Sequence, residues 1–241
     1  MTYYKTLAST GRGPCSDYVW PLPLENAPGE WTPTIDGDLV SCRIGYHLCR
    51  PGDLIHWLHP RIFVAEPRDE IIACKDKVIC RAARLVREIT TWTPRTQRAF
   101  GCDCVEHVLH LYEAAYPDDS RPRQAIEMAR RYILGDADET QLADTWASTW
   151  ADDAAGAAAG ASARYAAWAA GGAAKYAAWA AGDAAWDAAW DAAWAAGAAA
   201  RAAGAAARYA AKDAAWDAAV KSERAWQTER LFWYLDGEGE V

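Results

Sequence analysis

Residues 154–219 contain no Leu, Ile, Val, Met or Phe, the side chains that fill most protein cores. They also contain no proline, because the last proline of the chain is Pro122. The first absence excludes an ordinary branched-aliphatic core in this segment, and the second removes the strongest helix breaker. What remains is mainly Ala, the best helix former, with Trp, Tyr, Gly and charged residues. We therefore expect helices here.

The chain also lacks any uncharged apolar run of about 18 residues, the length that a membrane-spanning helix needs. Its first residues, "MTYYKTLASTGRGP", lack the apolar region of a signal peptide. The cysteines number seven, which is odd, and are expected to be reduced thiols. These features predict a cytoplasmic protein that does not bind membranes.

Clustered cations are missing from the second half of the sequence. Residues 1–95 carry 12 Lys and Arg against 11 Asp and Glu, whereas residues 96–241 carry 13 against 22. Binding to nucleic acid requires clustered cations that neutralise phosphates, so no nucleic-acid surface is expected there. The acidic excess suits a basic protein partner instead.

The composition changes near residue 93. Residues 1–92 hold eight of the eleven prolines, and Val/Ile runs such as "RIFVAEP" predict strands between turns. Thr93 can cap a helix that has Pro94 at its first position. We predict an α+β fold, with a small strand-rich domain over residues 1–92 and an all-α, Ala/Trp-rich helical bundle over residues 93–241.

Further helix boundaries are marked by single residues. Gly135 is expected to end the helix that contains "RQAIEMARRYIL". Asp138 and Gln141 have the spacing of a capping box that opens a third helix.

The Ala-rich segment repeats every 11 residues, as in "YAAWAAGGAAK" followed by "YAAWAAGDAAW", which is a helical period. On a helical wheel its Trp and Tyr side chains share one face, and the opposite face is almost purely Ala. The candidate partner-binding residues are the ladder within "DAAWDAAWDAAW", which comprises Asp183, Trp186, Asp187, Trp190, Asp191 and Trp194.

Three interpretations of this ladder differ in what the indole rings contact. The rings fill the core of a folded-back bundle, or they form an exposed acidic and aromatic strip that binds a protein partner. An ice- or lipid-binding face is disfavoured, because Tyr or Trp stands where alanine-rich antifreeze helices carry Thr. The Ala face could also pair with the same face of a second chain, so a homo-oligomer is a further alternative.

Two clusters could carry chemistry. Tyr46, His47 and Cys49 are weak candidates in the first domain, since a Cys–His pair can form a thiolate nucleophile. A purely structural strand explains them as well. Cys102, Cys104, His107 and His110 offer zinc ligands, but their spacing is not that of usual zinc sites, and we interpret them as packing and surface residues. We assign no catalytic residue, metal or cofactor.

Three stretches resemble a known family: "TWTPRTQRAFGCDCVEHVLHLYE" at 91–113, "PDDSRPRQAIEMAR" at 117–130 and "ERAWQTERLFWYL" at 223–235. Together with the Ala/Trp tail, they are similar to an immunity-protein family of bacterial polymorphic toxin systems that is also met in phages. The resemblance covers about residues 91–236. It implies an all-helical protein that binds and neutralises a toxin, and it brings no catalytic residues.

The first domain resembles an uncharacterised domain of phage and bacterial proteins over about residues 1–90. The matching stretches are "GYHLC" at 45–49, "DLIHWL" at 53–58 and "DKVICRAARLVREI" at 76–89. That domain has no known function. This resemblance therefore implies a similar fold but suggests no activity.

The function predicted from the sequence is non-enzymatic. We expect an immunity or inhibitor protein that neutralises a toxin or defence effector through its acidic, aromatic helical half. One alternative is an enzyme or nucleotide-binding module in residues 1–92, with the helical half as adaptor. Another is a structural or oligomerising protein.

Overall fold

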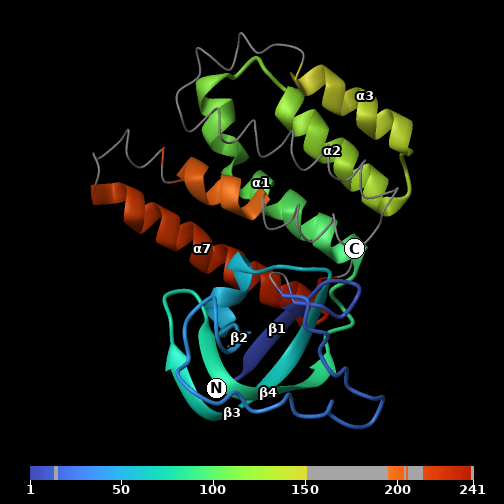
Figure 1. The fold of residues 1–241 in the computed structure, drawn as a ribbon. Coiled ribbons are helices and arrows are strands. Elements are labelled where there is room, and N and C mark those ends of the chain that lie inside the picture. The colour runs from blue at the N-terminus through green and yellow to red at the C-terminus, as the bar shows by residue number, and fades with distance from the viewer. Residues whose placement is uncertain (14–15, 151–194, 204, 206–213, 240–241) are drawn as a thin grey trace. The chain divides into compact units, whose positions relative to one another are not determined.

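The computed structural model describes residues 1–13, 16–150, 195–203, 205 and 214–239. The chain divides into two compact units, Met1–Trp92 and Thr93–Val241. Strands occupy the first unit and helices the second, which confirms the predicted α+β class (Figure 1).

The first unit is built on one antiparallel sheet with the strand order β1-β3-β4-β2. Its elements are β1 (Tyr3–Leu7), β2 (Tyr46–Leu48), the 3-10 helix η1 (Pro51–His56), β3 (Arg61–Ala73) and β4 (Val78–Glu88). The long hairpin of β3 and β4 curves, and β1 and β2 pair with its outer edges (Figure 1). Each of these two strands therefore pairs with a strand that is not its neighbour in the sequence, and a bridge between Tyr4 and Cys49 connects β1 to the end of β2.

Strand β3 continues through Pro67, where the sequence pattern suggested an end. Proline cannot donate a ladder hydrogen bond and is found in sheets near irregularities. The register between β3 and β4 does shift, between Arg68 and Ile71, and Asp69 there has a positive φ of 67°. A bulge thus lets the hairpin remain paired on both sides of the proline.

One face of the sheet carries the hydrophobic core of the first unit. The cluster consists of Leu7, Trp20, Leu48, Phe63, Ala65, Val78, Cys80, Ala83 and Leu85, with Tyr3, Tyr18 and Tyr46 packed against it. Side chains two apart on a strand share a face, so Tyr3, Lys5 and Leu7 of β1 all face this core. A lysine therefore stands in an apolar row.

The second unit contains α1 (Pro94–Ala115), α2 (Arg121–Leu134), α3 (Glu139–Trp150) and α7 (Ala214–Leu235). The predicted boundaries are confirmed. Thr93 caps α1 and accepts a hydrogen bond from the N–H of Thr96, and Gly135 ends α2 in the left-handed region. Asp138 and Gln141 each accept the other's backbone N–H, which is the capping box expected before α3.

Residues 195–203 are also helical, and this segment is buried on nearly every side. Ala195, Ala196, Ala198, Ala199, Ala200 and Ala202 are each at most 2% exposed. The Nε2 of Gln227 on α7 donates a 2.9 Å hydrogen bond to the carbonyl oxygen of Ala196. Gly197 lies within the helix and makes no turn. A Cβ there would meet the guanidinium groups of Arg201 and Arg224 at 3.7 and 3.8 Å, which are ordinary van der Waals distances.

In the part of the chain that the structure describes, no helix is long and apolar enough to cross a membrane.

Candidate functional site

The acidic and aromatic ladder lies outside the described residues. Asp183, Trp186, Asp187, Trp190, Asp191 and Trp194 all belong to it, and their assignment to partner binding stays a prediction. Trp226 of α7 is described, and its ring stacks on that of His107 with centroids 3.7 Å apart. This indole therefore packs within the helical unit.

The first unit contains a cavity of about 500 Å³. Tyr46, His47 and Cys49, the three candidates from the sequence, all contribute to its lining. They come from β2 and the residue just after it. The rest of the lining comes from β1, from the loops around residues 13–20 and 35–45, and from Trp57 and Lys77. The three clustered residues are thus part of a real concavity.

His47 is fixed by two backbone contacts at the cavity. Its Nε2 accepts a 3.0 Å hydrogen bond from the N–H of Cys42, and its carbonyl oxygen accepts one from the Lys5 ammonium at 3.2 Å. Burial lowers the pKa of His47, and the charges of Lys5 and Lys77 lower it further. The imidazole is therefore neutral at pH 7, and its Nε2 accepts rather than donates.

Cys49 is held in a way that opposes nucleophilic chemistry. It is 6% exposed, and its backbone exchanges hydrogen bonds with Tyr4 of β1. Burial raises the pKa of its thiol to about 12, despite the nearby charges of Lys5 and Lys77. Because the reactive form is the thiolate, this thiol is almost wholly unreactive at neutral pH.

Two buried lysines flank the neutral histidine. Lys5 and Lys77 are each 8% exposed. The Lys5 ammonium lies 4.9 Å from the ring centre of Trp20, and that of Lys77 lies 4.6 Å from Trp57. Lys77 also pairs with Asp76 at 2.9 Å. Burial alone would lower the pKa of Lys77, but its contacts with Asp76 and Cys42 raise it, so the lysine is charged.

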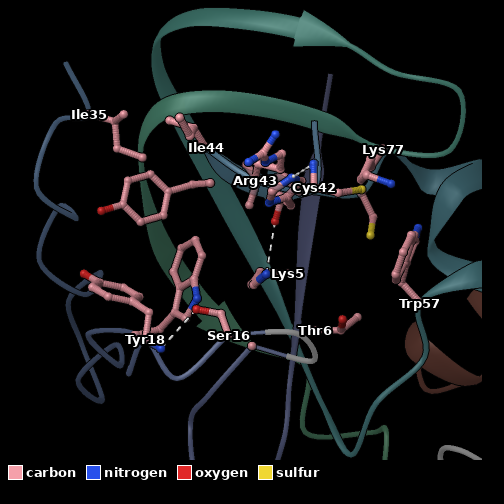
Figure 2. Close-up of a pocket in the computed structure, with 17 residues that line it drawn as sticks. Lys5, Thr6, Ser16, Tyr18, Ile35, Cys42, Arg43, Ile44, Trp57 and Lys77 are labelled. Carbon is pink, nitrogen blue, oxygen red and sulfur yellow. Dashed lines mark hydrogen bonds between the residues drawn. The ribbon is translucent and has the colours of Figure 1, made fainter. Parts of the chain in front are cut away.

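Aromatic rings form one wall of the cavity. Tyr18, Trp20 and Tyr46 meet edge to face, with ring centroids 5.5 to 6.0 Å apart. Trp57 stands on the other side of Lys5 from Tyr18, beside Lys77 (Figure 2). Its indole N–H is already used, because it donates to the carbonyl oxygen of Asp76 at 2.9 Å.

Sequence reasoning missed the lysines and the aromatic wall. Lys5, Trp20 and Lys77 are distant from "GYHLC" along the chain, and the fold of the sheet and its loops brings them there. Trp57 follows η1, eight residues after Cys49. One local signal existed. Lys5 interrupts "YYKTL", a strand that is otherwise apolar on the face it shares with Tyr3 and Leu7.

The helical unit has a buried polar network of its own. The carboxylate of Asp103, which is 7% exposed, accepts hydrogen bonds from Arg130 at 2.8 Å, Arg230 at 2.5 Å and the Tyr234 hydroxyl at 2.7 Å. These partners lie on α2 and α7, so one side chain of α1 joins three helices. The network is internal and points to stability rather than to a site.

A second polar cluster joins α1 to α7. Glu223, 4% exposed, contacts His107 Nδ1 at 2.8 Å and accepts a hydrogen bond from Gln227 at 2.9 Å. Cys102 and Cys104 are buried in the same helix packing, and burial raises the pKa of both thiols. Among the residues that the structure describes, no three His, Cys, Asp or Glu side chains are grouped to hold a metal ion.

Comparison with known proteins assigns the helical half. A family model described as "Immunity protein Imm5" matches residues 79–236. The match begins within β4, earlier than the start near residue 91 inferred from the sequence, and ends just after α7. No curated protein and no solved structure matches the chain. Because the matched region spans most of the sequence and includes all the described α-helices, the chain belongs to the Imm5 immunity protein family.

Proposed function

We propose that this protein neutralises a bacterial toxin by binding it, without catalysing a reaction. The observation that carries the proposal is the family match over residues 79–236, which takes in the whole described helical unit. The buried Asp103 and Glu223 networks fit a binding protein, because they fix the helices against one another and leave the outer surface for recognition.

We assign the toxin-binding surface to the ladder Asp183, Trp186, Asp187, Trp190, Asp191 and Trp194. Residues 96–241 carry an excess of nine acidic over basic side chains, since they contain 22 of one and 13 of the other. An acidic surface accelerates capture of a basic partner, and Trp is the residue most enriched at energetic centres of interfaces. The partner is therefore a basic toxin. The six described cysteines are all free, which supports action in a reducing cytoplasm.

The experiment takes the product of each gene that flanks this one as a candidate toxin. Co-expression of the full chain is expected to rescue growth of cells that produce the toxin, and the purified proteins should form a complex in size-exclusion chromatography. Trp190→Ala and Asp187→Lys should each weaken the complex at least about tenfold, which corresponds to about 1.4 kcal/mol.

Asp217→Lys is the matched control, because Asp217 is an exposed aspartate on α7 outside the ladder. This variant should bind as the native chain does. Failure of the native chain to rescue growth or to bind the neighbouring toxin contradicts the proposed function. Equal loss in Asp217→Lys and Asp187→Lys contradicts the assignment of the surface.

A further inference from the structure

The cavity of the first unit is lined by the charged side chain of Lys5, which lies on the core face of the sheet. Lys5 lies between Tyr3 and Leu7 on the inward face of β1, and its cross-strand partner on β3 is Phe63. Leu7 and Phe63 are both fully buried members of the hydrophobic cluster. Removing an ammonium from water costs several kcal/mol unless its surroundings compensate. An apolar residue at this position would be the simpler way to build the fold, so the position of Lys5 calls for a functional explanation.

The lining of the cavity is positive. It includes the cationic side chains Lys5, Arg43 and Lys77, and among the described residues it includes no carboxylate. Two carboxylates act on Cys49 from outside the lining. Asp53 pairs with Arg50 at 2.6 Å, and Asp76 pairs with Lys77 itself at 2.9 Å, so the charge of Lys77 is partly balanced. The neutral His47 and the protonated Cys49 contribute no negative charge. An anionic group is therefore the ligand chemistry that this cavity favours.

Aromatic rings make up part of the remaining lining. Tyr18, Trp20 and Tyr46 pack into one wall, and Figure 2 shows Lys5 between Tyr18 on one side and Trp57 on the other. Aromatic side chains bind planar rings by stacking, at about 1–3 kcal/mol per ring. The volume of about 500 Å³ is within the range of small-molecule sites.

We propose that this cavity binds a small molecule that combines a planar ring with a phosphate or carboxylate, of about the size of a nucleoside monophosphate. Lys5 and Lys77 hold the anionic group, and the ring lies against the aromatic wall. The site is separate from the toxin-binding surface proposed for the helical unit, and its ligand is a free small molecule rather than a protein.

Isothermal titration calorimetry on the full chain tests the proposal with three probes: adenosine 5′-monophosphate, uridine 5′-monophosphate and phenyl phosphate. Adenosine and inorganic phosphate serve as the two halves of the first probe. At least one ring phosphate is expected to bind at submillimolar concentration, and each half should bind at least about tenfold more weakly. Lys5→Met should weaken binding about 10- to 100-fold, the loss expected when a charge-assisted hydrogen bond is removed.

Lys77→Met should have a similar effect, and it decides the question if Lys5→Met does not fold. Lys75→Met is the matched control, because Lys75 is an exposed lysine two residues away that does not line the cavity. No binding of any probe at millimolar concentration overturns the proposal. Binding that survives both cavity variants, or that Lys75→Met weakens equally, also overturns it. The proposal is also overturned if inorganic phosphate or adenosine binds as tightly as the ring phosphates.

Discussion

Asp103 is the residue on which the described helices depend most directly. Its carboxylate accepts hydrogen bonds from Arg130 of α2 and from Arg230 and Tyr234 of α7. Burial raises the pKa of Tyr234, and the charge of Asp103 raises it further, so the phenol stays protonated and donates. Loss of the carboxylate removes the anion that Arg130 and Arg230 share, although Arg130 keeps its contact with Glu106.

Asp103→Asn should therefore destabilise the protein by about 3 kcal/mol, the lower end of the range for removing one partner from a buried ion pair. Urea unfolding followed by far-UV circular dichroism measures the change. Glu106→Gln is the control, because Glu106 also contacts Arg130 but is exposed, and its loss should cost less than about 1 kcal/mol. If both variants lowered the free energy of unfolding equally, the buried carboxylate of Asp103 would contribute no more to stability than the exposed one of Glu106.

His59 makes the stability of the first unit depend on pH. It is 7% exposed, and burial, together with the charge of Lys5, lowers its pKa from the ordinary 6.5 to about 4. As the pH falls below about 6.5, the unfolded chain takes up the proton before the folded chain does. Stability from the neutral imidazole is therefore complete above pH 6.5, is lost between 6.5 and 4, and falls no further below that window.

Between pH 7 and pH 4.5 this group should lower the free energy of unfolding by about 2–3 kcal/mol. The His59→Gln variant has no titratable group at this position, so its free energy of unfolding should fall by less over the same pH interval. Urea unfolding at the two pH values measures both. The main-chain oxygen of His59, which accepts from the Trp92 indole at 3.0 Å, is retained in the variant. Parallel losses in the two proteins would contradict this account.

At the scale of elements, the helix at residues 195–203 fits its surroundings because its side chains are small. Ala199 has no exposed surface, and neither do Ala196 and Ala198. A larger side chain must displace neighbours or the backbone, which costs about 1–3 kcal/mol in a well-packed interior. Ala199→Leu should lower the free energy of unfolding by that amount, despite the high helix propensity of Leu.

Ala225→Leu provides the comparison, since Ala225 is exposed on α7. Its effect should lie within about 0.5 kcal/mol of zero. Chemical denaturation of the two variants separates packing from propensity. A neutral Ala199→Leu would show that the segment has room around it.

The helix ends could be predicted from single residues, whereas the cavity could not. The capping residues Thr93, Gly135, Asp138 and Gln141 contact only residues a few positions away. The local sequence is therefore sufficient to predict these helix ends. Tyr46, His47 and Cys49 were found because they are adjacent. Lys5 of β1 joins them through a sheet whose order, β1-β3-β4-β2, is not sequential, and no local pattern encodes that pairing. The continuation of β3 through Pro67 depends in the same way on its partner strand.

At the scale of the whole molecule, the burial of the Ala side chains affects whether copies of the chain associate. A free Ala face would favour close pairing between helices of different chains. In the described helix at 195–203 the Ala side chains are already buried within one chain, and Gln227 binds the carbonyl oxygen of Ala196. We therefore expect a monomer at micromolar concentration, as measured by multi-angle light scattering. A stable dimer that Ala225→Leu leaves intact would contradict this expectation.

The contact between Gln227 and Ala196 has a consequence for how such a chain can diverge. The amide binds a main-chain atom that every residue possesses, and the neighbouring positions require only smallness. Residue 196 can therefore change among small side chains without loss of this hydrogen bond. The interaction thus sets a limit on size at this position, and not on chemical identity.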